Sequence, residues 1–282
     1  MMIPRRAPRF SIAIPSSLVS EVPHLREKTG VIGQVARAAS IYRVEDIYVY
    51  RDEPDESNLI RLILSYLETP QYLRRRLFRK RPELSYVGTL HPLRTPHHPL
   101  ESSLKKLSVG EYREGIVVSE GSGGALVDIG VETPLSAAGR APSTGSRATV
   151  RVTSIAPELR GVFARRRDID EYWGYQVHNV GGGIGKIAHS REFDLKIATS
   201  RKGRDYTQIE SALQAELRKA NHVLVSFGSP KRGLQELLHN DGVSLEQAFD
   251  FTINTIPLQG CETVRTEEAI HATLALLNAM NV

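Results

Sequence analysis

The residues best placed to do chemistry lie at the ends of three predicted strands. Thr199-Ser200, Phe227–Ser229 and Ile256–Gly260 each follow a short apolar run, and the last two belong to Gly- and Pro-containing loops that precede helix-like patterns. The carboxyl end of a strand presents free backbone N–H and C=O groups, and open α/β sheets hold their ligands at that edge. If the three strands are parallel neighbours, their loops meet. The pattern therefore predicts a small-molecule pocket built mainly from main-chain groups.

Two glycine-rich segments do not fit a phosphate-binding loop. The stretch 181–186 (Gly-Gly-Gly-Ile-Gly-Lys) is followed by Ile187, where that motif needs a Ser or Thr hydroxyl. Gly228 and Gly233 have the outer spacing of the motif, but Leu234 follows where lysine is required. The first stretch is therefore interpreted as a glycine-rich connection.

Three histidines in a proline-rich stretch, His91, His97 and His98, raise the question of a metal site. No Cys, Asp or Glu stands near them at metal-ligand spacing, so they are interpreted as loop residues near RNA, and no metal is expected. The sequence also lacks a Gly-x-Ser-x-Gly nucleophile elbow, which argues against a serine hydrolase of that type.

Alternating strand and helix patterns must position the three strand ends. This alternation occurs at both ends of the chain and predicts an α/β fold with a mainly parallel sheet. The predicted strands are 10–15, 46–50, 195–200, 222–227 and 249–254; the predicted helices are 56–67, 206–218 and 266–280, with two more beginning near Thr29 and Lys231.

The middle of the chain has a different pattern. Between residues 88 and 167, Gly, Pro, Ser and Thr are dense, and the apolar runs 114–119 and 125–130 flank a glycine-rich hairpin signal. Residues 148–153 alternate polar and apolar side chains, as a half-buried strand does. These features predict a small antiparallel β-barrel. The turn from Gly115 to Gly130 resembles oligonucleotide-binding barrels, although a purely structural barrel is the alternative.

Basic residues are concentrated in one segment. Residues 70–114 contain ten Lys or Arg and four acidic residues. The whole chain has a net charge of +5, so the rest of the chain is nearly neutral. Six bases fall within eight residues, and such a cluster is self-repelling unless a polyanion is near. A solvated surface is the alternative, but the cluster favours RNA binding by Arg74, Arg75, Arg76, Arg79, Lys80 and Arg81.

Length and composition limit the class of protein. A chain of 282 residues with 40% hydrophobic residues can form two domains with real cores. No apolar run approaches the roughly 20 residues of a membrane span, and the N-terminus lacks a signal-peptide pattern. Cys261 is the only cysteine, so an internal disulfide is excluded. We expect a cytoplasmic protein that does not enter a membrane.

The loops 226–233 (Ser-Phe-Gly-Ser-Pro-Lys-Arg-Gly) and 256–260 (Ile-Pro-Leu-Gln-Gly) resemble the knotted cofactor loops of the SPOUT superfamily of RNA methyltransferases. More narrowly, the chain is similar from Phe10 to its last helix to an archaeal and eukaryotic branch of rRNA uridine methyltransferases with an inserted β-barrel. The resemblance implies a discontinuous knotted α/β domain, residues 1–87 and 168–282, interrupted by an OB-like, RNA-binding barrel, residues 88–167. It also implies S-adenosylmethionine as the cofactor and a uridine ring nitrogen of rRNA as the acceptor.

The resemblance and the strand ends together predict a set of cofactor-binding residues. Many relatives carry a Ser-Leu-Asn-type turn where this chain has residues 261–265, so backbone roles transfer more directly than side-chain roles there. The predicted set is Thr199, Ser200, Phe227, Gly228, Ser229, Gly233, Ile256, Leu258, Gln259, Gly260, Thr263 and Val264.

Methyl transfer from a sulfonium donor asks little of the protein, because the leaving group is already excellent. The protein must align the acceptor and stabilise it as it loses a proton. The candidates for stabilising a uridine anion are Arg201, Lys202 and Arg204, the two arginines first, and ordinary surface bases are the alternative.

The last predicted helix, residues 266–280, carries apolar residues on more than one face. Such a helix must be covered on two sides, by its own sheet and most simply by a second copy of the chain. We therefore expect a homodimer; coverage by the barrel or by the first helix is the alternative. The expected function is RNA methylation, with a noncatalytic RNA-binding or ribosome-assembly protein of the same fold as the alternative.

Overall fold

The computed structural model describes residues 2–280, so residues 1, 281 and 282, at the ends of the expected α/β domain, lie outside the described residues. The chain divides into two compact units. The barrel unit consists of residues 2–5, Glu68–Arg81 and Leu93–Trp173, and the sheet unit consists of Arg6–Leu67, Pro82–Pro92 and residues 174–280.

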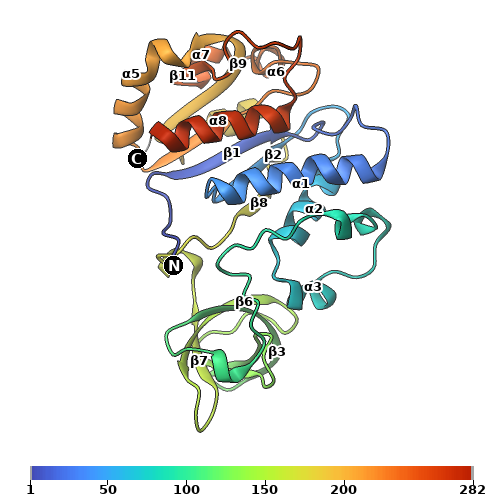
Figure 1. The fold of residues 1–282 in the computed structure, drawn as a ribbon, viewed down its shortest axis with the longest axis vertical. Coiled ribbons are helices and arrows are strands. Elements are labelled where there is room, and N and C mark those ends of the chain that lie inside the picture. The colour runs from blue at the N-terminus through green and yellow to red at the C-terminus, as the bar shows by residue number, and fades with distance from the viewer. Residues whose placement is uncertain (1, 281–282) are drawn as a thin grey trace. The chain divides into compact units, whose positions relative to one another are not determined.

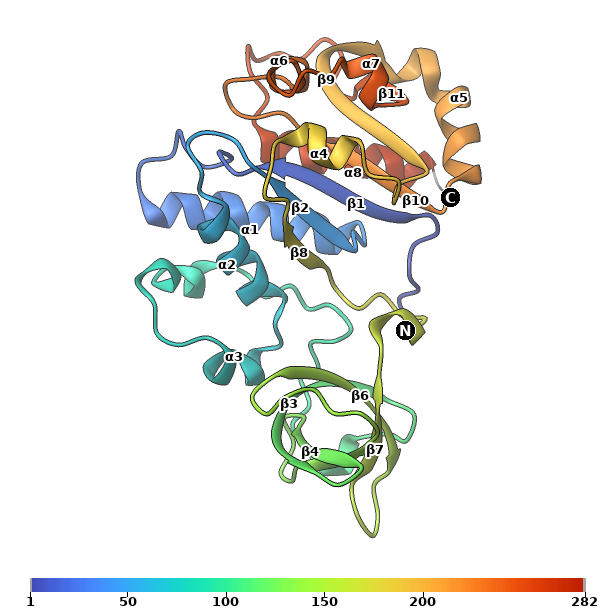
Figure 2. The same ribbon diagram turned by 180° about the vertical axis from the view of Figure 1, so that it is seen from behind.

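The sheet unit is built on six parallel strands in the order β11-β9-β10-β1-β2-β8 (Figures 1 and 2). Its middle strand β1 is apolar along both faces, as parallel strands covered on two sides must be. The direction in which strands are added changes between β1 and β10, which is where open α/β sheets hold ligands. The strands are β1 Arg9–Pro15, β2 Asp46–Tyr50, β8 Gln176–Asn179, β9 Leu195–Asp205, β10 His222–Ser226 and β11 Phe251–Asn254.

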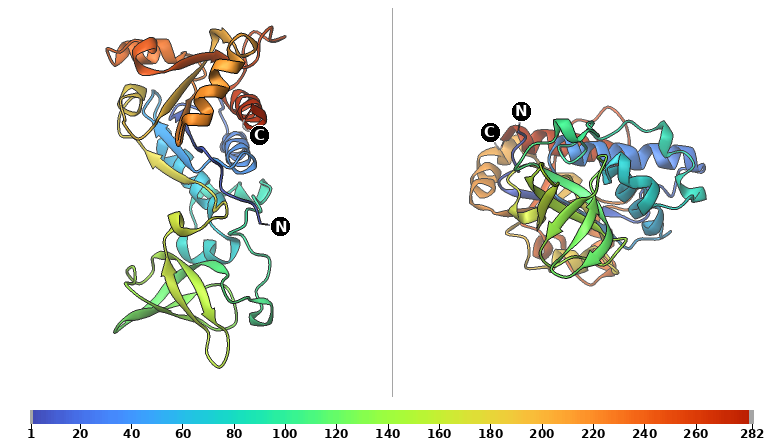
Figure 3. Two further views of the ribbon diagram at one scale, coloured as in Figure 1. Left: turned by 90° about the vertical axis from the view of Figure 1, so that its left-hand side faces the viewer. Right: turned by 90° about the horizontal axis from the view of Figure 1, so that it is seen from below.

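Helices cover both faces of this sheet. α1 (Leu25–Ile41) and α8 (Thr266–Met280) lie side by side on one face, as the edge-on view in Figure 3 also shows. The other face carries α4 (Ile184–Ala188), α6 (Leu234–Asn240) and α7 (Leu245–Ala248), whose apolar side chains form one core cluster with Tyr50 and Leu224 of the strands. The remaining helices of the unit are α2 Ser57–Glu68 and α5 Tyr206–Lys219.

The parallel sheet and its helices confirm the predicted α/β class. Predicted strand 46–50 and helix 266–280 have their expected bounds. Helix α1 begins at Leu25 rather than near Thr29. The strand β8 is not among the predicted strands, and α4 begins within residues 181–186, which the sequence indicates only as a glycine-rich connection. Within residues 2–280, none of the helices combines the length and the apolar composition that crossing a bilayer requires.

The barrel unit contains a closed barrel in the order β3-β4-β5-β7-β6. Its strands are β3 Tyr112–Gly121, β4 Gly124–Asp128, β5 Leu135–Ala138, β6 Arg147–Ser154 and β7 Arg160–Ala164. Val127, Leu135 and Val150 are fully buried inside it. The predicted small barrel is therefore confirmed, with one difference: β5 and β7 pair in parallel, so the barrel is mixed.

Short helices complete the two units. α3 (Gln71–Leu77) belongs to the barrel unit and carries half of the basic cluster. The 3-10 helices are η1 Pro82–Leu84, η2 Val87–Thr89, η3 Leu104–Lys106 and η4 Arg166–Asp168.

Candidate functional site

The site begins with an irregularity in β9. Ala198 pairs with Thr252 of β11, but the next pair joins Arg204 to Ile253, so residues 199–203 bulge out of the ladder. A Cβ atom on Gly203 would lie 2.6 Å from the carbonyl carbon of Ile253, and only glycine allows the two strands to close again after the bulge. The bulge displaces Thr199–Lys202 from the sheet at its carboxyl edge.

The loop after β10 is folded tightly on itself. The Ser229 N–H donates to the Arg232 carbonyl oxygen at 2.9 Å, and the Arg232 N–H donates to Ser229 Oγ at 3.1 Å. A Cβ atom on Gly228 would approach that same Arg232 oxygen to 3.0 Å, so the Arg232 carbonyl would have to shift to admit a side chain. The Thr266 hydroxyl, at the start of α8, donates to the Gly228 carbonyl oxygen at 3.2 Å and ties the loop to the third strand end.

The loop after β11 is held by side-chain amides. The Asn254 side chain accepts from the Ile256 N–H at 3.0 Å and donates to the Arg201 carbonyl oxygen at 3.1 Å, which links this loop to the β9 bulge. Gln259 donates to the carbonyl oxygens of Cys261 and Glu262 at 2.8 and 3.0 Å. The loop is thus shaped by its own amide groups.

The three loops surround one cavity of about 710 Å³. This volume falls in the range of roughly 300–1,000 Å³ that small-molecule sites occupy. Helices α6 and α7 close another side through residues such as Leu234 and Leu245. The structure therefore brings the three strand ends together, as their positions in the sequence predict.

Ten of the twelve predicted cofactor-binding residues line this cavity: Thr199, Ser200, Phe227, Gly228, Ser229, Gly233, Ile256, Gln259, Thr263 and Val264. Leu258 and Gly260 are not among the lining residues. The Leu258 side chain is fully exposed at a positive φ of 53°, and a Cβ atom on Gly260 would meet nothing within 4 Å.

The lining suits a molecule with one flat apolar part and several polar groups. Phe227, Leu234, Ile256 and Val264 provide apolar surface, and Thr199, Ser200 and Gln259 provide polar groups. S-adenosylmethionine, with its adenine ring and polar tail, has this character, so the residues present fit the cofactor that the resemblance implies.

The two arginines proposed for catalysis lie differently. Arg201 lines the cavity, and its guanidinium donates to the Glu262 carbonyl oxygen at 2.8 Å. Arg204 lies beyond the bulge, paired in register with Ile253, and is exposed outside the lining. Of the two, only Arg201 therefore stays a candidate at this cavity.

Sequence reasoning missed two charged residues beside the cavity. Arg232 lines it and forms an ion pair with Asp52, which follows β2. Two signals could have found them: Asp52 stands at a strand end like the others, and Arg232 belongs to the loop 226–233.

The predicted RNA-binding residues all lie in the barrel unit. Arg76 pairs with Asp128 of the barrel at 2.9 Å, and Arg74 donates to the Thr69 carbonyl oxygen. Arg75, Arg79, Lys80 and Arg81 are exposed. The basic segment therefore belongs to the same compact unit as the barrel.

The histidines have a structural role. His97 and His98 both approach the Glu68 carbonyl oxygen, at 2.8 and 2.6 Å, and the His97 ring also contacts the Glu68 carboxylate. The His97 ring is buried, so it is a loop residue as expected but does not face a partner such as RNA. Across residues 2–280, no three His, Cys, Asp or Glu side chains gather as a metal site would require.

Comparison with known proteins identifies a family for the chain. The model of the family described as "Putative RNA methyltransferase" matches residues 9–277, nearly the whole chain and all three cavity loops. The chain is also 37% identical over 286 residues to an uncharacterized protein of Halobacterium salinarum, covering 95% of this chain and 98% of that protein.

Two animal relatives have a named activity. The chain is 32% identical to the 28S rRNA (uridine-N(3))-methyltransferase of Drosophila melanogaster, covering 95% of this chain and 61% of the fly protein. It is 32% identical to the mouse enzyme of the same name, covering 95% of this chain and 75% of the mouse protein. The chain belongs to this family of RNA methyltransferases and is homologous to the 28S rRNA uridine-N3 methyltransferases.

Proposed function

We propose that the protein is an S-adenosylmethionine-dependent methyltransferase that modifies N3 of a uridine in large-subunit rRNA. The observation that carries the proposal is the cavity of about 710 Å³ formed by the loops of β9, β10 and β11. The names of the animal relatives supply the acceptor atom and the class of RNA.

The cofactor would lie among the main-chain groups of the three loops, against Phe227, Ile256 and Val264. When bound, it supplies a methyl group on a sulfonium, which needs no metal. The protein's own residues hold the acceptor in line, exclude water and stabilise the charge that develops on the base.

RNA binding is assigned to the barrel unit. The exposed bases of residues 75–81 would contact phosphates, which gives affinity without base specificity. The barrel would receive an unpaired stretch of the RNA, as oligonucleotide-binding barrels do.

We also propose that the protein is a cytoplasmic homodimer. The helix α8 buries one stripe, including Ile270, Leu274 and Leu277, against its own chain, where α1 packs beside it. Ala275 and Ala279 on another face are exposed, and small residues allow a second helix to approach closely. A single, exposed cysteine suits a reducing compartment.

The test combines cofactor binding with product analysis. Calorimetry with S-adenosylhomocysteine should show one site per chain, and large-subunit rRNA transcribed in vitro should acquire N3-methyluridine, detected by mass spectrometry of its nucleosides. RNA binding without cofactor binding or methylation would instead favour a noncatalytic ribosome-assembly role. A different methylated nucleoside would refute the uridine N3 assignment alone.

A further inference from the structure

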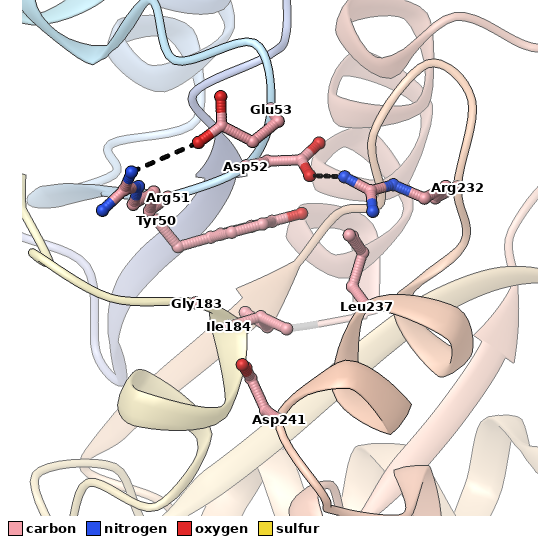
Figure 4. Close-up of a pocket in the computed structure, with 9 residues that line it drawn as sticks. All are labelled: Tyr50, Arg51, Asp52, Glu53, Gly183, Ile184, Arg232, Leu237 and Asp241. Carbon is pink, nitrogen blue, oxygen red and sulfur yellow. Dashed lines mark hydrogen bonds and ion pairs between the residues drawn. The ribbon is translucent and has the colours of Figure 1, made fainter.

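A second, smaller cavity lies beside the cofactor cavity in the sheet unit. Its volume is about 200 Å³, below the roughly 300–1,000 Å³ of whole-ligand sites, so it suits a single ring. It is bordered by Tyr50 at the end of β2 and the three residues that follow it, by Gly183 and Ile184, and by Arg232, Leu237 and Asp241 (Figure 4). The lining thus combines charged residues such as Asp52 and Arg232 with the aromatic Tyr50 and the aliphatic Ile184 and Leu237.

Asp52 is the most firmly held residue of this cavity. Its backbone N–H and carbonyl oxygen both bond to the Ser16 hydroxyl, at 2.9 and 2.8 Å. Its carboxylate accepts from the Ser17 hydroxyl and pairs with the Arg232 guanidinium, and only 2% of the side chain is exposed. A carboxylate fixed in this way, at the rim of a cavity, is preorganised to accept one more hydrogen bond.

Arg232 joins the two cavities. It lines both of them, and its main chain forms the cofactor loop through Ser229 while its side chain reaches Asp52. A second link is the Tyr50 hydroxyl, which donates at 2.7 Å to the carbonyl oxygen of Phe227, a residue of the cofactor cavity. A group in the small cavity would therefore lie next to the methyl donor.

Asp52 and Arg232 together match the hydrogen-bonding groups on one edge of uracil. That edge presents an N–H donor at N3 between two carbonyl acceptors, and enzymes that modify bases read flipped bases by hydrogen bonds to this edge. A carboxylate accepts from N3–H, and a guanidinium, with five N–H donors, can pair with Asp52 and still donate to a neighbouring carbonyl oxygen. Cytosine has an acceptor at N3 and would meet the carboxylate unfavourably.

We propose that this cavity receives the acceptor uracil, with Asp52 accepting the N3 proton and Arg232 donating to the carbonyl oxygen on which negative charge develops. The inference rests on the proposed function and names the residues that select the base. As the bond from N3 to the methyl carbon forms, the carbon–sulfur bond of the donor breaks and its electron pair remains on sulfur. The N3 proton passes to Asp52, which later releases it to water.

The first test measures base selection without catalysis. With the cofactor cavity filled by S-adenosylhomocysteine, saturation-transfer NMR should show that the wild-type protein prefers uridine monophosphate to cytidine monophosphate. Asp52→Asn places an amide donor where N3 of cytosine can accept it, so this variant should lose or reverse the preference. Glu210→Gln, which neutralises an exposed carboxylate on α5, is the control and should keep it.

The second test measures transfer. Asp52→Asn should bind S-adenosylhomocysteine within about twofold of the wild-type Kd, yet slow methylation by about 100-fold or more, the usual contribution of general base catalysis. The remaining rate should rise with pH. With a transcript containing 5-fluorouridine, whose N3–H is more acidic, the Asp52→Asn variant should recover part of the lost methylation rate. The N3 proton then leaves more easily without a carboxylate to accept it.

Arg232→Lys provides a second variant should Asp52→Asn fail to bind S-adenosylhomocysteine. Lysine keeps a charge for Asp52 but loses the forked donors, so methylation should fall about tenfold or more with cofactor affinity retained. An unchanged uridine preference in Asp52→Asn, or a wild-type protein without any preference, overturns the inference. A parallel loss of cofactor affinity in both variants also overturns it, since the small cavity would then hold part of the cofactor. Absence of N3-methyluridine with the wild-type protein refutes the proposed function instead.

Discussion

At the scale of single residues, the shape of the two cavities depends on close contacts and hydrogen bonds of individual residues. Gly228 is held between the Arg232 carbonyl oxygen and the Gly233 Cα, at 3.0 and 3.3 Å from where its Cβ would be. Asp52 is fixed by Ser16, Ser17 and Arg232. The neighbours of Gly228 leave little room for a side chain, and only 2% of the Asp52 side chain is exposed, so substitutions at either residue should act on binding or chemistry.

Gly228→Val should weaken the binding of S-adenosylhomocysteine by about tenfold or more. The branched side chain would push the Arg232 carbonyl away and open the turn that shapes the cavity. Gly260→Val is the matched control, because its side chain enters open space and Gly260 does not line the cavity. Calorimetry measures the affinity of each variant for S-adenosylhomocysteine, and thermal unfolding verifies that each variant is folded. Equal affinity in the Gly228→Val and wild-type proteins would remove Gly228 from the site.

The buried network of the barrel unit should make that unit sensitive to acid. Burial and then the neighbouring His97 lower the pKa of His98 to about 3. Burial alone would raise the pKa of Glu68, but Arg147 and His97 outweigh it and lower that pKa below its ordinary value. In the unfolded chain His98 is protonated below its ordinary pKa of about 6.5. In the folded chain it stays neutral until the pH reaches about 3.

The free energy of unfolding should therefore fall as pH decreases from about 6.5 toward 3, by at most about 1.4 kcal/mol per pH unit for this one proton. The stabilisation from Glu68 is present above its unfolded pKa and is lost at lower pH, so it adds in the same direction. His98→Gln keeps a donor for the Glu68 carbonyl oxygen but does not titrate, and it should flatten the dependence between pH 6.5 and 5. Urea unfolding at several pH values, followed by the fluorescence of Trp173, measures this. A variant with the wild-type slope would exclude His98 as the cause.

At the scale of elements, the segment around α3 concentrates the charge that the rest of the chain lacks. The exposed guanidinium groups of Arg75, Arg79 and Arg81 follow one another along the helix and the residues after it. Arg76 is instead anchored to Asp128 of the barrel. Arg76 is exposed as well, but it already pairs with a carboxylate, so the variant below replaces only Arg75, Arg79 and Arg81.

Replacing Arg75, Arg79 and Arg81 together by Gln should weaken RNA binding and lower its dependence on salt. Each phosphate contact that is lost reduces the slope of log K against log[salt] by about 0.7 for single-stranded RNA. Fluorescence anisotropy with a labelled oligouridine at several salt concentrations measures the slope. Arg218→Gln, at an exposed base of α5 in the sheet unit, is the control. A slope equal to that of the wild type would mean that the cluster is only a solvated face.

At the scale of the whole molecule, the exposed face of α8 bears on the number of chains in the assembled protein. The helix α8 is covered on one stripe, whereas Ala275 and Ala279 are exposed and Leu276 is partly exposed. A second copy seated on this face would bury these side chains of α8, the helix whose first residue, Thr266, lines the larger cavity. Assembly and function would then be coupled through α8.

Light scattering at micromolar concentration should give a mass about twice the chain mass of 31.3 kDa. Ala275→Glu should convert the dimer to a monomer, because a charge would be buried without a partner across the interface. Ala215→Glu, at an exposed alanine of α5, should leave the mass unchanged. A wild-type mass near that of one chain would refute the dimer.

Local patterns in the sequence are enough to predict most strands and helices of the sheet unit and most of the lining of the larger cavity. Hydrophobic runs with helical or strand spacing specify which residues are buried, so β2 and α8 have the expected bounds. Parallel strands place their carboxyl ends at one edge, so the loops at Thr199, Phe227 and Ile256 meet, as their positions imply. Glycines and other small residues at those ends indicate close backbone packing, because larger side chains would keep the loops apart.

Only the tertiary structure decided which charged residues face one another. Asp52 and Arg232 are 180 residues apart, and their pairing depends on β2 and β10 lying on either side of β1, which no local pattern encodes. The same holds for β8 and α4, whose short sequences form a strand and a helix only because neighbouring strands and the core cluster supply partners. The burial of His97 against Glu68 is a third case, since a histidine in a proline-rich loop has no local reason to be enclosed. Long-range pairing sets the chemistry of this protein because charge and hydrogen bonding act between atoms in contact, whatever their separation along the chain.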